Sequence, residues 1–310
     1  MKQHDLLPSR RLFIRVLSSA CIATGLITPA VYAADTLAVT TSFSILGDLV
    51  KVVGKERVTV STLVGPNQDA HVFEPKPSDA KAIQNSKLLV INGLGFEPWA
   101  NKLAKAANFK GTTVFASKGI RPLGSTEHKG HAHHHDDADP HAWQNPLNVI
   151  QYVTNISNAL TALDPAGAAI YQSNAQAYIK EVQALDNWIE NQFSGIATEK
   201  RKVITSHDAF AYFAARYKIK FVAAQGTSTE AEPSAKQIAK LVQQIKREKV
   251  KTVFVENMSN PKLLEQISKD AGASVGAHLY ADALSAAGQP GATYLQMMRH
   301  NVSQMAASMQ

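Results

Sequence analysis

Cysteine is almost absent from this chain of 310 residues, since the only one is Cys21, near the N-terminus. The segment around it has the form of a secretory signal, with basic residues at 9–15, an apolar run at 16–31 and an expected cleavage after Ala33 or Ala34. The exported protein then contains no cysteine, which excludes disulfide bonds and thiolate metal ligands. Any metal site must be built from nitrogen and oxygen ligands.

A long hydrophobic run is also lacking. The apolar part of the signal is too short, and too often interrupted by Ser, Thr, Gly and Pro, to be a good membrane span. The Ser-Arg-Arg-x-Phe pattern at 9–13 fits both a twin-arginine signal and an ordinary secretory signal, which leaves the export route open. A lipoprotein signal is not expected, because Ser18 stands where such signals have Leu, three residues before Cys21.

Excess charge of one sign is small. The formal net charge is +7, of which the predicted signal carries +3, so the exported chain keeps +4. A charge this mild for the size of the chain gives no reason to expect nucleic-acid binding. The exported chain of about 277 residues is long enough for two domains.

What the chain does contain is an alternation of strand-like and helix-like segments. The expected strands are residues 36–41, 57–63, 88–92, 112–116, 202–206, 221–224, 251–256 and 274–279. The expected helices are residues 44–53, 78–85, 98–107, 146–163, 165–195, 209–217, 233–249, 261–271 and 292–307. This order predicts an α/β fold with two lobes, each a mainly parallel four-stranded sheet covered by helices.

One of the expected helices is unusually long. Asp164-Pro165 is a typical helix start, and apolar residues at helical spacing continue to about Gly195. At 1.5 Å per residue the helix would be about 45 Å long, so we expect one rigid helix that joins the two lobes. The predicted organisation is a signal peptide at 1–33, an N-terminal lobe at 34–163, a linker helix at 164–197 and a C-terminal lobe at 198–310.

A histidine-rich stretch, residues 128–143, interrupts this pattern. It holds six of the eleven histidines, namely His128, His131, His133, His134, His135 and His141. Imidazoles and carboxylates at this density do not pack into a core, but they can bind a transition metal. Pro140 and Trp143 should hold His141 in one place. The other five lie in a loop at 128–138 and are expected to bind metal more weakly, because ordering a flexible loop costs entropy. A solvated polar linker is the alternative for this loop.

Four metal-capable residues occupy corresponding positions in the pattern. His71, His207 and Asp282 each follow an expected strand, and His141 follows the histidine-rich loop. Sites in open α/β sheets form outside the carboxyl ends of the strands, and two of the four residues come from each lobe. Each alone is more readily explained as a surface or capping residue, but their shared position favours a common site.

The donor set of these four residues points to a particular metal. Three imidazoles and one carboxylate make a tetrahedral shell suited to Zn²⁺. Because a free imidazole titrates near pH ~6.5, metal affinity is expected to fall between about pH 6 and 5. Glu74, Asp208 and Glu256 lie near the expected site and are interpreted as supporting or capping groups. His278 and His300 lack such a context and are interpreted as structural.

The chain resembles the periplasmic zinc-type solute-binding proteins of metal ABC importers over essentially its whole exported length. The resemblance is most specific at residues 69–79, 92–99, 139–146, 205–212 and 279–285. It implies two α/β lobes joined by one long helix, with metal ligands at His71, His141, His207 and Asp282. Manganese members of this family usually have glutamate at the position of His207, and a histidine-rich loop is typical of the zinc-type branch.

The resemblance therefore implies a monomeric periplasmic receptor that binds one Zn²⁺ tightly and delivers it to an ABC permease in the inner membrane. The histidine-rich loop would capture scarce zinc or accept it from a periplasmic donor protein. A manganese or iron receptor of the same family and an exported zinc buffer without a transporter remain alternatives. A zinc hydrolase would need an open metal position and a base such as Glu74 or Asp208, and four protein ligands leave no open position.

Overall fold

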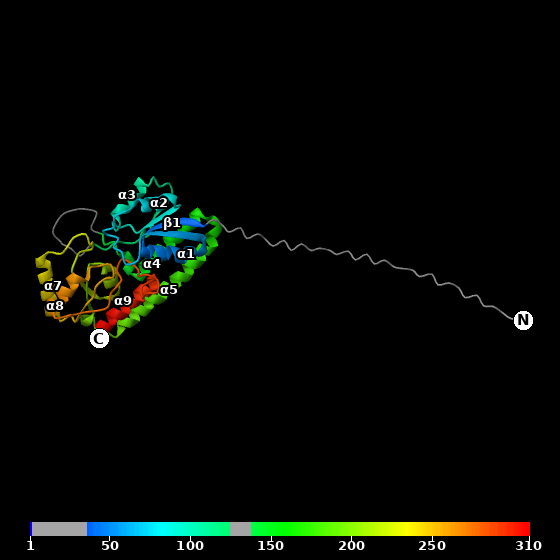
Figure 1. Ribbon diagram of the computed structural model, residues 1–310. Helices are drawn as coiled ribbons and strands as arrows, with labels where there is room; N and C mark the ends of the chain where they lie inside the picture. The colour runs from blue at the N-terminus through cyan, green and yellow to red at the C-terminus, as the bar shows by residue number, and fades with distance from the viewer. Residues whose placement is uncertain (2–35, 125–137) are drawn as a thin grey trace. The chain divides into compact units, whose positions relative to one another are not determined.

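Two four-stranded sheets, both parallel throughout, form the framework of the computed structural model, which describes residues 36–124 and 138–310 in addition to Met1 (Figure 1). In spatial order, the N-terminal sheet consists of β2 (Val58–Val64), β1 (Leu37–Phe43), β3 (Leu88–Ile91) and β4 (Thr112–Phe115). The C-terminal sheet consists of β6 (Lys220–Ala223), β5 (Lys202–Thr205), β7 (Thr252–Val253) and β8 (Ser274–Val275). The two sheets thus share one strand order.

Helices connect successive strands, as parallel pairing requires. They are α1 (Ser44–Gly54), α2 (Pro77–Asn85), α3 (Pro98–Ala106), α4 (Pro146–Leu163), α5 (Ala168–Ser194), α6 (Ala211–Tyr217), α7 (Ala235–Glu248), α8 (Pro261–Ala271) and α9 (Tyr294–Ser308). Several begin with a capping residue followed by proline, as expected from the sequence. Asn145 and Asn260 each accept a hydrogen bond from a backbone N–H of the first turn, and a proline follows each of them.

Alternating side chains bury both faces of each sheet. In β3, Leu88 and Val90 pack into the core that also contains α1, α4 and α5, while Leu89 and Ile91 pack with α2 and α3. The C-terminal sheet repeats this arrangement, since Val203 packs in the core with α6 and α9 and Ile204 packs with α7 and α8. Near-continuous apolar strands of this kind are what a parallel sheet covered on both faces needs.

The long helix α5 connects the N-terminal half, residues 36–163, to the C-terminal half, residues 198–310. Its 27 residues give a length of about 40 Å, and it packs against α1 and α4 on one side of the junction and against α6 and α9 on the other (Figure 1). Val182, Leu185 and Ile189 form part of its buried face. The predicted α/β fold with a long connecting helix is confirmed. The lobe boundaries stay a prediction, because α9 also contacts α1 and residues 35–310 form one compact unit.

The last two strands are shorter than the sequence indicates. The predicted strands 251–256 and 274–279 pair regularly only over β7 and β8. Gly276 N–H donates to Val253 O, and the next such bond runs from Leu279 N–H to Val255 O. The chain therefore advances three residues on one strand for two on the other, which is a bulge with one extra residue. The pairing resumes only as an isolated bridge between Glu256 and Leu279.

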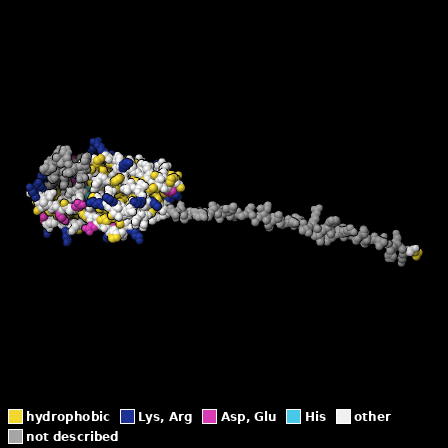
Figure 2. Space-filling model, turned by 90° about the horizontal axis from the view of Figure 1, so that it is seen from above, with side chains coloured by type: hydrophobic (Ala, Val, Ile, Leu, Met, Phe, Trp, Pro, Cys, Tyr) yellow, Lys and Arg dark blue, Asp and Glu magenta, His cyan; other side chains and the backbone are white. Residues whose placement is uncertain are grey.

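The surface of the described residues has a mixed character. Figure 2 shows Lys and Arg side chains scattered over one face among hydrophobic and uncharged atoms. No helix within residues 36–124 and 138–310 has the length and apolarity needed to cross a membrane. Apart from Met1, the predicted signal at 1–33 lies outside the described residues, and so do the loop histidines at 128–135.

Candidate metal centre

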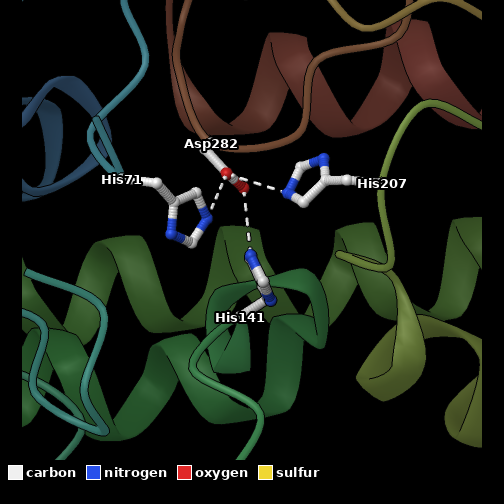
Figure 3. Close-up of side chains that lie close together, drawn as sticks. All are labelled: His71, His141, His207 and Asp282. Carbon is white, nitrogen blue, oxygen red and sulfur yellow. Dashed lines mark ion pairs between the residues drawn. The ribbon is translucent and has the colours of Figure 1, made fainter. Parts of the chain in front are cut away.

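The four residues singled out in the sequence converge on one point. His71, His141, His207 and Asp282 each offer a ligand atom, and these atoms lie within 4.8 Å of one another (Figure 3). The Nε2 atoms of His71 and His207 lie 3.2 Å and 3.1 Å from Asp282 Oδ2, and His141 Nε2 lies 3.6 Å from Asp282 Oδ1. Ligands of a tetrahedral Zn²⁺ are spaced by about 3.3 Å, given bonds of about 2.0–2.1 Å.

The ligand atoms have no other hydrogen-bond partner among the described residues. The three Nε2 atoms and both carboxylate oxygens of Asp282 are buried and make no hydrogen bond there. Buried polar atoms are rarely left unpaired, because each one costs free energy. Five such atoms that face each other fit the needs of a bound cation.

The parallel topology explains why distant residues meet here. His71 lies between β2 and α2, His207 comes two residues after β5, and Asp282 follows the bridge at Leu279. The carboxyl ends of the strands in both sheets thus face the same region, as expected for an open α/β fold. His141 comes from the segment before α4, and Figure 3 shows its ring opposite the Asp282 carboxylate.

Two of the histidines are oriented by a second carboxylate. His141 Nδ1 lies 2.8 Å from Asp139 Oδ1, and His207 Nδ1 contacts Glu256 Oε2. A carboxylate at Nδ1 keeps a proton there and leaves Nε2 available to a metal. Glu256 also accepts hydrogen bonds from the backbone N–H groups of Ser206 and His207, so it fixes both the ring and the backbone of this ligand.

The other two acidic residues interpreted as supporting groups are more exposed than Glu256. Glu74 is exposed, because residues 74–76 run along the surface to the start of α2. Asp208 is half-buried, and its backbone N–H donates to Gly226 O. Neither belongs to the group whose ligand atoms converge. His300 Nε2 donates to the backbone O of His278, as befits a structural role for this pair.

Sequence reasoning missed Asp69 and Asp139. Each lies two residues before a histidine of the centre, and its Oδ1 accepts the backbone N–H of that histidine at 2.8–2.9 Å. The signal was present in the sequence as two copies of an Asp-x-His pattern, Asp69-Ala70-His71 and Asp139-Pro140-His141. An aspartate that bonds the backbone two residues onward forms a local turn, which here fixes the direction of the ligand.

Glu97 was missed as well. Its buried carboxylate accepts hydrogen bonds from Ser42 Oγ at 2.7 Å and from the backbone N–H groups of Asn92 and Gly93. Burial raises the pKa of Glu97 to about 7. It joins the ends of β1 and β3 as Glu256 joins the ends of β5 and β7, so each sheet has a buried glutamate across its central strands.

The segment that carries His141 is held from several directions. Four of its backbone carbonyl groups accept hydrogen bonds from side chains of both halves. The pairs are Asn92 to Pro140, Tyr212 to Asp139, Asn148 to Ala142 and Tyr294 to Trp143, at 2.8–3.0 Å. Trp143 and Gln144 in turn donate to Ala281 O, next to Asp282. These bonds tie the second ligand to the fourth across the two halves.

The centre is also strongly coupled electrostatically. Burial alone would lower the pKa of His141, but the Asp282 and Asp139 carboxylates raise it to about 9. The pKa of His207 is raised well above its ordinary value, because Glu256 and Asp282 outweigh its burial. Burial would raise the pKa of Asp282, but His207 and His141 hold it well below its usual range. Without metal, protons on these imidazoles therefore balance the buried carboxylate.

Comparison with known proteins places the chain among metal-binding transport proteins. Residues 39–308 match the family model described as zinc-uptake complex component A, periplasmic. The manganese-binding lipoprotein MntA of Halalkalibacterium halodurans is 35% identical over 266 residues, which is 86% of each chain. The iron ABC transporter substrate-binding lipoprotein MtsA of Streptococcus pyogenes is 32% identical over 92% of each chain.

Solved structures agree with these relatives. A Mn-bound periplasmic metal binding protein from Candidatus Liberibacter asiaticus matches with a TM-score of 0.78 and 30% identity, over 89% of this chain and 100% of that one. The periplasmic zinc binding protein TroA from Treponema pallidum matches with a TM-score of 0.81 and 25% identity, over 89% of this chain and 99% of that one.

Metal binding should release protons well above the pH range expected from free imidazole. His141 must lose a proton that it holds up to about pH 9, so metal affinity should rise continuously as the pH is raised towards 9. Calorimetric titration in buffers of different ionisation enthalpy measures the released protons. No proton release at pH 7.5 would show that His141 is neutral in the metal-free protein.

Replacing Glu256 by Gln should weaken metal binding by about 10- to 100-fold. The amide N–H₂ would oppose the Nδ1–H of His207 and favour the tautomer whose Nε2 carries the proton and cannot bind metal. Equilibrium titration measures the affinity, with Glu248→Gln as a matched control. Glu248 pairs with Lys202 and Lys220, and its change should leave the affinity as it was. Equal effects of the two changes would contradict a role for Glu256 in orienting His207.

Proposed function

Because the chain belongs to the periplasmic zinc-uptake complex component A family, we propose that it captures Zn²⁺ outside the inner membrane and delivers it to an ABC permease. The observation that carries this proposal is the convergence of three buried imidazole Nε2 atoms on one buried carboxylate, with no other hydrogen-bond partner for any of them among the described residues. His71, His141, His207 and Asp282 would be the ligands. Residues 1–33 would direct the chain to the periplasm.

The family consists of transport receptors, so the chain is a binding protein and not the hydrolase considered from the sequence. Family membership also gives the chain a membrane permease as its partner. This argues against a free zinc buffer. A monomeric state and a periplasmic donor protein remain part of the proposal.

The choice of zinc depends on the ligand set. The relatives named above are called manganese-binding, iron and zinc proteins, so their names point to several metals. Manganese favours more oxygen ligands and a higher coordination number, whereas imidazole suits zinc. Three imidazoles, two of them with a carboxylate at Nδ1, and one carboxylate ligand support zinc.

The unaltered protein should bind one Zn²⁺ per chain in the tight site and prefer it to Mn²⁺. His207→Glu should shift this preference towards Mn²⁺ by about one order of magnitude, because it exchanges a nitrogen ligand for oxygen. Competitive titration with both ions measures the preference. His278→Glu, the same change at an exposed histidine, is the control and should leave it unchanged. Equal or tighter Mn²⁺ binding by the unaltered protein would favour the manganese or iron receptor.

The histidine-rich loop should add only weaker sites. His128, His131, His133, His134 and His135 lie outside the described residues, and we expect them to capture zinc and pass it to His141. Deletion of residues 127–137 should therefore leave one tightly bound Zn²⁺, remove weaker binding and slow loading. Metal analysis and uptake kinetics measure these effects. Loss of the tight site on deletion would show that the loop supplies a primary ligand.

A further inference from the structure

The four residues of the centre differ in their access to solvent. His141, His207 and Asp282 are fully buried, whereas His71 is 7% exposed. The residue after it, Val72, is 50% exposed. The centre is therefore closest to solvent at His71.

The four residues also differ in how firmly they are held. The Nδ1 atoms of His141 and His207 contact Asp139 and Glu256. Asp69 contacts the backbone N–H of His71 instead of its ring. Within the described residues, the His71 ring lacks a carboxylate at Nδ1 like those of the other two histidines. His71 is thus the histidine whose ring can move at the least cost.

The loop that carries His71 is bonded to the other half of the protein at two places: Asn67 bonds Leu284 and Asn257, and a second contact lies beside His71 itself. Thr229 Oγ1 donates to Asp69 Oδ2 at 2.6 Å, and the other oxygen of the same carboxylate accepts the backbone N–H of His71. Thr229 lies between β6 and α7, in the C-terminal half. A single carboxylate therefore links the backbone of His71 to a segment 160 residues further along the chain.

A polar cavity lies beside this contact. It has a volume of about 330 Å³, and its lining includes Asp69, Thr229, Ser206, Gln225 and Glu232. Ser206 immediately precedes His207, so the cavity adjoins the segments of two ligands. Liquid water occupies about 30 Å³ per molecule, which leaves room for an ion with much of its hydration shell.

We propose that the metal enters and leaves past His71, and that the hydrogen bond from Thr229 to Asp69 keeps this side of the centre closed. The proposal rests on the proposed function, since it concerns exchange of the transported ion. The three buried ligands stay in place, while the His71 segment moves away from the C-terminal half when the bond opens. In this proposal, Asp69 and Thr229 control how fast the metal enters and leaves. The four ligands determine how tightly it is bound.

The test is Thr229→Val, which keeps the size of the side chain and removes its hydroxyl. We expect metal uptake and metal release to become faster together, each by about tenfold, with Kd within about threefold of the unaltered value. Stopped-flow mixing with metal, and with a strong chelator, measures the two rates. Thr229→Ser keeps the hydroxyl and should retain the original rates. Thr227→Val makes the same change two residues away and should also have no effect.

Two results would overturn the proposal. Unchanged rates in Thr229→Val would show that the contact does not limit exchange. Faster release at constant uptake, with Kd raised in proportion, would show that the contact stabilises the loaded form instead of controlling passage. The probe is whichever of Zn²⁺ and Mn²⁺ the unaltered protein binds more tightly. If the protein does not prefer zinc, the titration of the unaltered protein shows it. The rates of the variants relative to the unaltered protein test the role of the Thr229 contact separately.

Discussion

The structure depends on one buried carboxylate that faces three imidazoles. Asp282 is fully buried, and a carboxylate in such a place is costly unless positive charge or hydrogen bonds balance it. Protonated His141 and His207 supply that balance in the metal-free protein, and a divalent cation would supply it in the loaded one. Protons and metal thus compete for the same nitrogen atoms. The buried carboxylate can stay charged in both states because the charge of the cation replaces the charge of the protons.

The segment from Asp139 to Gln144 holds His141 in position relative to Asp282. Its carbonyl groups accept bonds from side chains of both halves, and its own side chains bond the backbone next to Asp282. Such a segment behaves as a rigid part of the core, although it has little regular secondary structure. The rigid helix α5 and the contacts of α9 with α1 have the same effect at larger scale. Movement at the centre should therefore be local, which agrees with the different degrees of support for His71 and the other ligands.

Much of this arrangement could be predicted from the sequence. Apolar periodicity and the Asn-Pro starts located the strands and helices, and the rule that sites lie at the carboxyl ends of strands selected the four residues that converge. Contacts that depend on the path of a loop could not be predicted in this way. Glu74 is close to His71 in the sequence, yet its loop runs outward along the surface. Asp69 and Asp139 were recognisable only as a repeated Asp-x-His pattern, whose meaning became clear from the backbone bonds it makes.

The extra residue between Gly276 and Leu279 has a consequence for the centre. Successive residues of an extended chain point to opposite sides, so one added residue reverses the side that every later residue faces. The bulge therefore decides which residues face each side of the sheet when the chain reaches the bridge at Leu279, three residues before Asp282. A chain with one residue fewer here would begin the loop that carries Asp282 about 3 Å earlier along the sheet, so spacing matters as well as residue type.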